Sequence, residues 1–168
     1  MAGTARRPLL TRAFDKFYLR IRHRQAWSSA EAEPSDPVRG FEPLRGHEYA
    51  LLTTFRRSGE PVPTPVWFGM GDDGHLYFRS ESGVGKLKRI RNDGRVRLAP
   101  CTMRGKPLGP PVEGRARILP PDDEERAERS IQANYGRFRK LYEGMGDRIG
   151  MEARYVEVEP ATAPAPAA

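Results

Sequence analysis

The segment from Val62 to Cys101 constrains the fold most, because its residue pattern predicts five elements in a fixed order. It opens with an alternation of period two, the spacing of a strand, in which one face holds Val62, Thr64, Val66 and Phe68. Gly-Asp-Asp-Gly at 71–74 has the composition of a turn, and residues 75–80 return as a second strand. A strand at 95–102 comes last, after a short basic helix whose apolar residues recur at every third position, in Val84, Leu87 and Ile90.

The start of this short helix carries hydroxyls, glycines and cations, in Ser80, Ser82, Gly83, Gly85, Lys86, Lys88 and Arg89. Backbone N–H groups, the positive end of the helix dipole and nearby lysines together favour the binding of a phosphate. The alternative is an ordinary capped surface helix, whose charges only keep that face soluble. The segment is not a P-loop, because the glycine spacing differs and Leu87 stands where a hydroxyl residue is needed.

The remaining elements complete a small barrel. Residues 48–57 predict a strand that forms a hairpin with residues 62–70, and further strands are predicted at 112–119 and 154–159. A helix is predicted at 122–145, with an apolar stripe made up of Ala127, Ile131, Tyr135, Phe138, Leu141, Tyr142 and Met145. Proline cannot donate to a ladder, so the strand at 62–70 should have an open or irregular edge at Pro61, Pro63 and Pro65. We therefore predict a mainly β (α+β) fold, with six antiparallel strands in a Greek-key barrel and flanking helices.

The pattern divides the chain into an N-terminal arm and linker at 1–40, a barrel domain at 41–159 and a disordered tail at 160–168. Residues 6–27 can form a basic amphipathic helix, which would pack on its own barrel or on a dimer partner. The same charge pattern also permits weak contact with an anionic membrane surface. Residues 28–37 are rich in Ser, Glu and Pro and are typical of a flexible linker.

Charge and cysteine content narrow the partners and the compartment. A net charge of +7 and a pI near 9.9 predict an anionic partner, for which nucleic acid, a membrane or a polyanionic cofactor would each fit. The arginines are not interleaved with aromatic residues as in a stacking platform, so we predict no nucleic-acid partner. The single Cys101 cannot form an internal disulfide, which favours the cytoplasm. No apolar run approaches the roughly 18–20 residues that span a bilayer.

The sequence does not contain the residue patterns of common catalytic sites. Its histidines and Cys101 lack the spacing of metal ligands, so we predict no metal site, and no grouping resembles a nucleophile elbow. His75 and Tyr77 could each donate a proton near a bound ring. Three arginines near the strands could supply charge for an anionic tail, or could simply be solvated: Arg79, Arg97 and Arg104.

Three sequence stretches resemble a known family: TPVWF at 64–68, LYFRSESGVGKLKRIRND at 76–93 and VRLAPC at 96–101. Together they are similar to the split-barrel flavin and deazaflavin oxidoreductases related to pyridoxamine 5'-phosphate oxidase, and most of all to the F-420-dependent branch. The resemblance spans about residues 49–159, one whole domain.

The resemblance implies a split barrel, a homodimer and a hydride transfer between the deazaflavin coenzyme F-420 and an unsaturated small-molecule substrate. FMN is the alternative cofactor, and a non-catalytic protein that binds F-420 or haem is a further alternative. It implies that Ser80, Lys86 and Lys88 hold the cofactor's phosphate and that the ring lies beside Pro65, Val66 and Trp67. The full set of implied cofactor-binding residues is Pro65, Val66, Trp67, Phe78, Arg79, Ser80, Ser82, Gly85, Lys86, Lys88 and Arg104. No residue is assigned as a catalytic nucleophile or base.

Overall fold

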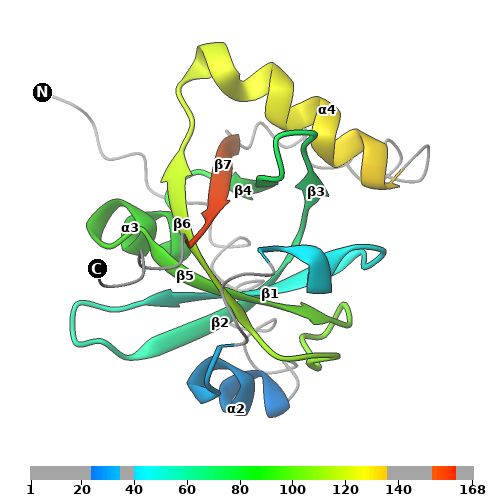
Figure 1. The fold of residues 1–168 in the computed structure, drawn as a ribbon. Coiled ribbons are helices and arrows are strands. Elements are labelled where there is room, and N and C mark those ends of the chain that lie inside the picture. Colours follow the sequence, from blue (N-terminus) through cyan, green and yellow to red (C-terminus); the bar gives the residue numbers. More distant parts are fainter. Residues whose placement is uncertain (1–23, 35–39, 136–152, 162–168) are drawn as a thin grey trace, which may run out of the picture.

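The fold is an antiparallel sheet that curls into a half-barrel, with helices on its outside (Figure 1). A computed structural model describes residues 24–34, 40–135 and 153–161. The strand order in the sheet is β2-β1-β5-β6-β7-β4-β3. The strands are β1 (Tyr49–Phe55), β2 (Pro61–Trp67), β3 (Gly69–Met70), β4 (Leu76–Glu81), β5 (Arg95–Cys101), β6 (Val112–Ile118) and β7 (Ala153–Pro160).

The predicted mainly β fold and its antiparallel pairing are confirmed, with seven described strands in place of six. The extra strand arises because the predicted strand at 62–70 is interrupted at Phe68. Its first part, β2, pairs with β1, whereas its last two residues, β3, pair with β4 at the other end of the sheet. One continuous segment therefore joins the two edges of the sheet and bends it into a half-barrel.

The edge position of β2 agrees with its prolines. β2 pairs with β1 and stands at the end of the strand order, where a missing N–H on one side costs no ladder bond. The hairpin between the two strands turns at Gly59, whose φ of 85° lies in the left-handed region that favours glycine. The predicted open edge is thus confirmed.

The core fills the inner face of the half-barrel. It is formed by alternate residues of the strands and by the buried side of the basic helix α3 (Gly85–Asn92), including Leu52, Val66, Phe68, Phe78, Leu87, Ile90, Leu98 and Val156. Because Val84, Leu87 and Ile90 are all buried, the three-residue spacing of this helix does mark its core face. The charged residues of α3 are thereby left toward the surface.

Helix α4 (Glu124–Tyr135) lies across the outside of β3, β4 and β7 (Figure 1). It is preceded by a short 3-10 helix, η3 (Pro121–Asp123), in agreement with the predicted acidic helix start. The helix backbone comes so close to Gly69 that a Cβ there would stand 2.1 Å from the carbonyl oxygen of Ser130. Glycine is therefore required at this point of the sheet. The predicted continuation of the helix to residue 145 lies outside the described residues.

A second helix, α2 (Gln25–Glu31), corrects the predicted linker. Residues 28–31 were expected in a flexible linker, but they continue this helix, and Ser29 and Ala30 are buried against the sheet. The Arg97 guanidinium fixes the helix end, since its Nη1 donates to the carbonyl oxygens of Ala30 and Ala32, each at 3.2 Å. Of the predicted arm helix at 6–27, the structure describes only residues 24–27, where Ala26 is buried against Leu51, Ala99 and Cys101 of the sheet. The packing of the rest of the arm stays a prediction, because residues 1–23 lie outside the described part.

The predicted tail begins later than expected. Pro160 still belongs to β7, and the backbone N–H of Ala161 donates to the Glu113 carbonyl oxygen at 3.1 Å. The rest of the tail lies outside the described residues. Among the described helices, none is long and apolar enough to cross a membrane. A further 3-10 helix, η2 (Glu42–Leu44), precedes β1.

Candidate functional site

The sheet is open along one seam, between β2 and the second half of β4. β3 pairs with β4 through Gly69 with Tyr77 and Met70 with Leu76, and the ladder then stops. In the same register, Trp67 would stand opposite Arg79 and Val66 opposite Ser80. β2 and β4 do come into contact, but no described strand pairs with these two edges. We call Pro65, Val66 and Trp67 of β2, with Phe78, Arg79 and Ser80 of β4, the seam.

The seam brings together six of the residues that the resemblance assigned to cofactor binding. Three of them point into the core: Val66 is 5% exposed, Phe78 is fully buried and Ser80 is 5% exposed. Their side chains alternate with those of Pro65, Trp67 and Arg79, which lie on the outer face. Because their side chains are buried, Val66 and Phe78 can offer a ligand only backbone groups.

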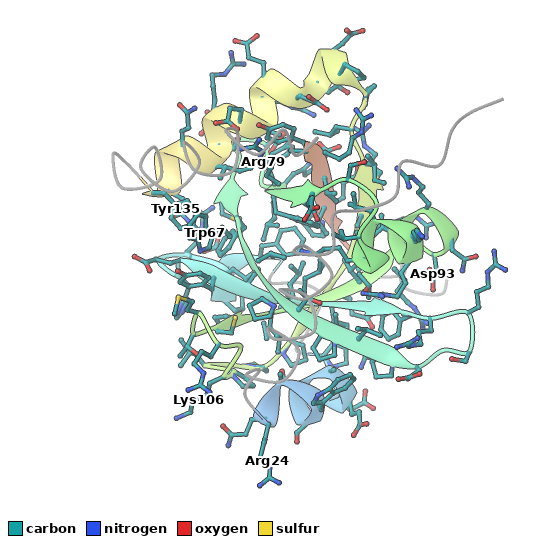
Figure 2. All side chains as sticks on the ribbon, turned by 180° about the vertical axis from the view of Figure 1, so that it is seen from behind. Arg24, Trp67, Arg79, Asp93, Lys106 and Tyr135 are labelled. Atoms are coloured by element: carbon teal, nitrogen blue, oxygen red, sulfur yellow. The ribbon has the colours of Figure 1, made fainter. Side chains whose placement is uncertain are left out.

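Trp67 is held on the outer face by two tyrosines. Its ring lies 5.5 Å from the Tyr135 ring and 6.1 Å from the Tyr49 ring, measured between centroids. The Tyr135 hydroxyl in turn accepts a hydrogen bond from the Phe68 N–H at 3.0 Å, at the point where β2 ends. Figure 2 shows Trp67 and Tyr135 together, on the opposite side of the barrel from Asp93 at the end of α3. These contacts fix the indole in one place beside the seam.

Three residues separate the end of β4 at Glu81 from the start of α3 at Gly85, and the N-cap residue of this helix provides no side-chain cap. Val84 is the N-cap residue and makes no side-chain hydrogen bond to the helix, and the first turn holds no acidic residue. Helix starts normally satisfy their first N–H groups with Ser, Thr, Asp or Asn. The absence of a side-chain cap at Val84 is consistent with the anion-binding interpretation of this helix start.

Ser80 adds a second unusual feature near this helix start. Its Oγ is buried and has no hydrogen-bond partner, one of three such side-chain atoms among the described residues. Buried hydroxyls are nearly always bonded, because an unpaired one costs free energy. Ser80 is the second-last residue of β4, and Ser82 and Gly83 follow the strand. Gly83 has a φ of 77°, which allows a tight turn between the strand and α3. A donor without an acceptor therefore stands at the end of the seam.

The cations of α3 differ in burial and in contacts. Lys86 is half-buried, and Lys88 is exposed. Arg89, which the sequence placed in the helix-start group, is held by β1: its Nε donates to Thr54 Oγ1 at 2.7 Å, and its Nη1 lies 2.9 Å from where a Cβ of Gly85 would be. Its guanidinium thus sits beside the first turn. The spacing from Gly85, one helical turn, is what brings the two residues together.

The remaining arginines lie away from the helix start. Arg104 is exposed and lies in the turn at 102–106. The next residue, Gly105, packs beside the Pro65 ring, so this turn approaches β2 from the outer face. Arg97 bonds to α2 and pairs with Glu113, with Nε and Oε1 3.4 Å apart, so it has a structural role. The structure brings Arg104 toward the Pro65 end of the seam and leaves Arg97 out.

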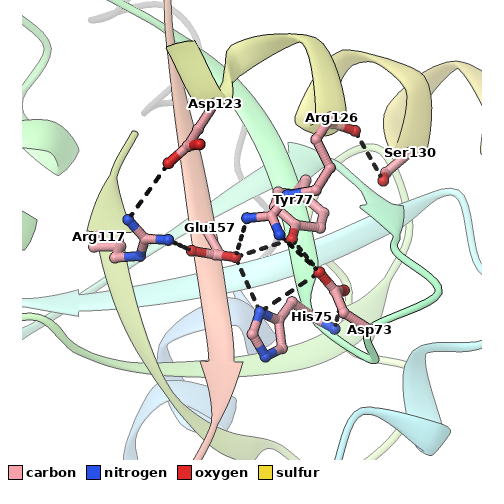
Figure 3. Close-up of polar contacts among 8 residues, drawn as sticks. All are labelled: Asp73, His75, Tyr77, Arg117, Asp123, Arg126, Ser130 and Glu157. Atoms are coloured by element: carbon pink, nitrogen blue, oxygen red, sulfur yellow. Dashed lines mark hydrogen bonds and ion pairs between the residues drawn. The ribbon is translucent and has the colours of Figure 1, made fainter. Parts of the chain in front are cut away.

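A separate polar cluster lies on the outer face beneath α4, around the buried carboxylate of Glu157 (Figure 3). Three groups contact it at 2.9 Å: His75 Nδ1, the Tyr77 hydroxyl and Arg126 Nη2. Arg117 forms an ion pair with its other oxygen. The Tyr77 hydroxyl also donates to Asp73 at 2.6 Å. The cluster therefore ties β4, β6, β7 and α4 together.

The neighbours of Glu157 and Tyr77 shift the pKa values of these two groups in opposite directions. Burial raises the pKa of Glu157, but hydrogen bonds from His75 and Tyr77 and the charges of the two arginines outweigh it and hold the pKa below its ordinary value. The pKa of Tyr77 is raised by burial and by its two carboxylate partners. His75 and Tyr77 are thus engaged with carboxylates under α4, and neither stands on the inner face of the seam as a proton donor.

The same cluster has the ligand types of a metal site, which sequence spacing did not reveal. Ligand atoms of Asp73, His75 and Glu157 all lie within 4.8 Å of one another. However, Arg126 reaches both carboxylates, and Arg117 pairs with Glu157 as well. Two guanidinium charges already neutralise the two carboxylates, so we interpret the group as an ion-pair network.

A family model and several solved structures match this architecture. The sequence profile of the pyridoxamine 5'-phosphate oxidase family matches residues 38–160. Among curated proteins no sequence match to the chain was found.

Solved structures share the fold at low sequence identity. A conserved hypothetical protein from Mycobacterium tuberculosis has a TM-score of 0.54 at 20% identity, covering 72% of this chain and 78% of its own. An FAD-binding protein from Mesorhizobium loti has 0.52 at 17%, covering 72% and 84%. A haem storage protein from Vibrio cholerae has 0.54 at 11%, covering 78% and 93%.

Proposed function

Because the chain belongs to the pyridoxamine 5'-phosphate oxidase family, we propose that its seam binds a phosphate-bearing redox cofactor, coenzyme F-420, for an oxidoreductase reaction. In this reaction a hydride moves between the deazaflavin and an unsaturated small molecule. One observation carries the proposal: an uncapped helix start and an unpartnered buried hydroxyl occur together at the end of the seam.

The residues at this point suit a phosphate. The Ser80 hydroxyl would donate to a phosphate oxygen, and the amides of the first turn of α3 would donate to the others. Lys86 and Arg89 would supply the compensating positive charge. This arrangement would give the buried Ser80 hydroxyl a partner and would place an anion at a helix start whose N-cap residue makes no side-chain hydrogen bond.

The seam itself suits a flat ring. Its two strand edges carry backbone groups that no described strand uses, and Trp67 stands beside them in a fixed position. Proline at position 65 has no N–H, so at that residue β2 offers only its carbonyl oxygen. The bound deazaflavin would supply the hydride-transfer chemistry. The chain would orient the ring, exclude water and hold the charge of the tail.

F-420 is preferred to FMN on charge. F-420 carries a phosphate and several glutamate carboxylates, whereas FMN has only the phosphate. A net charge of +7 suits the longer anion, and Arg104 lies where it could meet a tail beyond the outer face of β2. FMN remains the alternative, since a protein of the same fold is described as FAD-binding. We also propose a homodimer with the cofactor at its interface, as the family resemblance implies, and a cytoplasmic location, which the single Cys101 favours.

A non-catalytic haem-binding protein is the second candidate, favoured by the fold shared with the haem storage protein. Haem needs an axial ligand, and His75, the imidazole best fixed among the described residues, already bonds to Glu157 at 2.9 Å. This engagement disfavours His75 as a haem ligand and places the haem hypothesis second.

Fluorescence titration of the pure protein with F-420 and, separately, with FMN tests the proposal. The double variant Lys86→Ala with Lys88→Ala should bind F-420 at least about tenfold more weakly, since charged hydrogen bonds contribute about 1.5–3 kcal/mol each. The matched control, Arg91→Ala with Arg115→Ala, removes the same charge from two other exposed positions and should change affinity little.

Three results would argue against the proposal. Unchanged affinity in the lysine variant would move the phosphate site elsewhere. Micromolar binding of FMN without binding of F-420 would replace the cofactor. Tight binding of haem, with no turnover of reduced F-420 and candidate acceptors, would favour the storage function.

A further inference from the structure

Phe68 is the residue at which the chain leaves one edge of the sheet for the other. The ladder of β1 with β2 ends at the pair of Tyr49 with Trp67. The ladder of β3 with β4 begins at the pair of Gly69 with Tyr77. The Phe68 backbone therefore belongs to neither ladder, although its residue is only 1% exposed. A buried N–H or C=O without a partner costs free energy, so both backbone groups of Phe68 need bonds from elsewhere.

Two consecutive side chains at the end of α4 supply these bonds. The Phe68 N–H donates to the Tyr135 hydroxyl at 3.0 Å, and Asn134 Nδ2 donates to the Phe68 carbonyl oxygen at 2.9 Å. Nδ2 carries two hydrogens, and it also donates to the His47 carbonyl oxygen at 3.3 Å. The two side chains thus replace the missing ladder at Phe68 and connect it to the segment before β1. We call Asn134 and Tyr135 the clip.

Close packing of the helix against the strand brings the clip to Phe68. A Cβ at Gly69 would stand 2.1 Å from the Ser130 carbonyl oxygen, so glycine is what lets α4 approach the sheet here. Ser130 lies about one helical turn before the clip. The last turn of α4 is therefore held over the residue that joins the two ladders.

Tyr135 also contacts Trp67, the residue before Phe68. The two rings lie 5.5 Å apart between centroids, with an angle of 33° between their planes (Figure 2). The hydroxyl of Tyr135 therefore holds the Phe68 backbone while its ring packs against the indole. One side chain thus fixes both the direction in which the chain leaves β2 and the position of Trp67.

We propose that the clip positions the seam for the cofactor, by holding Phe68 between the two ladders and Trp67 beside the ring. This inference rests on the proposed function, since the ring is the ligand that the seam would hold. Asn134 and Tyr135 are positioning residues, because they act through Phe68 and Trp67. A molecule whose clip has opened would have to restore this arrangement before the ring binds, which lowers the apparent affinity.

A brace that only stabilises the fold is the alternative. Such a brace would change the free energy of unfolding, but in the folded protein it would leave Trp67 and the cofactor affinity as they are. The position of the clip favours our proposal, because both of its bonds go to the residue between the ladders. The link from Arg126 Nη2 to Glu157, at 2.9 Å, is a brace by comparison and lies more than two helical turns earlier in α4.

Quenching of Trp67 fluorescence in the cofactor-free protein tests the clip directly. In a Trp27→Phe background Trp67 is the only indole. Tyr135→Phe keeps the ring beside Trp67 and removes the acceptor for the Phe68 N–H, whereas Asn134→Ala removes the donor to the Phe68 carbonyl oxygen. Each variant should increase quenching by acrylamide and shift the emission to longer wavelength. The double variant should show the largest change.

Fluorescence titration with F-420 measures the effect on the seam. Each clip variant should bind F-420 about three- to tenfold more weakly, which is the loss expected for one hydrogen bond. The matched control is Arg126→Gln, which removes a link between α4 and the sheet at the other end of the helix. It should lower stability in urea and leave both the quenching and the F-420 affinity unchanged. Circular dichroism confirms that each variant is folded under the assay conditions.

Three results separate the possible failures. Unchanged quenching and affinity in both clip variants would overturn the inference and leave the clip as a brace. An equal loss of affinity in Arg126→Gln would overturn it as well, because the loss would then follow stability alone. Increased quenching in the clip variants, with no binding of F-420 or FMN by the unchanged chain, would refute the proposed function and still support the hold of the clip on Trp67.

Discussion

Replacing Ser80 with alanine should make the cofactor-free protein more stable while it weakens cofactor binding. The Ser80 hydroxyl is buried without a hydrogen-bond partner, and such a group costs about 1–3 kcal/mol. Alanine removes that cost and loses only the packing of one oxygen atom. We expect a net gain of about 1 kcal/mol in the free energy of unfolding, which for a chain of this size raises Tm by about 2–4 °C.

The same substitution removes a donor that we assign to the cofactor's phosphate. Hydrogen bonds to charged groups contribute about 1.5–3 kcal/mol, so affinity for F-420 should fall by about 10-fold to 150-fold. Thermal unfolding of the cofactor-free protein and fluorescence titration with F-420 measure the two effects separately. Opposite signs in stability and affinity are the signature of a residue kept for binding.

Ser130→Ala is the matched control for this experiment. The Ser130 hydroxyl donates to the Arg126 carbonyl oxygen at 3.1 Å and lies on α4, away from the seam. Its loss should change stability by no more than about 0.5 kcal/mol and leave F-420 affinity unchanged. If Ser80→Ala lowers stability and leaves affinity intact, the hydroxyl has a structural partner and our reasoning about the phosphate site fails.

Two further predictions concern the packing of α4. Gly69→Ala should lower the free energy of unfolding by about 2–3 kcal/mol, measured by urea denaturation, because its Cβ would meet the Ser130 carbonyl oxygen at 2.1 Å and displace the helix; wild-type stability would refute this close approach. Glu157→Gln should cost about 1–3 kcal/mol at neutral pH, since it leaves Arg117 and Arg126 without their carboxylate, although both arginines are about half exposed. The pKa of Glu157 is depressed on folding, so its stabilising contribution is present above the ordinary value of 4.5 and is lost as pH falls through the lower folded value. The Gln variant should therefore show a flatter acid limb in a plot of Tm against pH, and an unchanged limb would exclude this role.

Local patterns predicted most of the elements of the barrel. The alternation at 62–69, the three-residue spacing of α3 and the prolines of β2 each depend on neighbours in sequence, and all three predictions agree with the structure. The break at Phe68 could not be foreseen, because apolar alternation continues through it and only the closure of the sheet decides which neighbour each part pairs with. The second part of α2, residues 28–31, was predicted as linker because Ser and Glu are common in linkers, and only the packing of the small Ser29 and Ala30 against the sheet shows that the helix continues.

The parts of the site that depend on residues far apart in the chain could not be predicted from the sequence. The Glu157 cluster depends on the register of β4 with β7, which places Tyr77 opposite Glu157, 80 residues along the chain. The hydrogen bond from Arg89 to Thr54 joins α3 to β1 and likewise has no local signal. The missing partner of Ser80 is also visible only after the strand is packed. The sequence could indicate which segment binds an anion, but not which donors were unpaired.

A crystal structure of the protein soaked with F-420 tests the central claim most directly. We predict the cofactor's phosphate at the first turn of α3, within hydrogen-bond distance of the Ser80 hydroxyl and close to Lys86, with the deazaflavin ring along the seam beside Trp67. A phosphate bound by other residues, or a ring seated away from β2 and β4, would contradict the account.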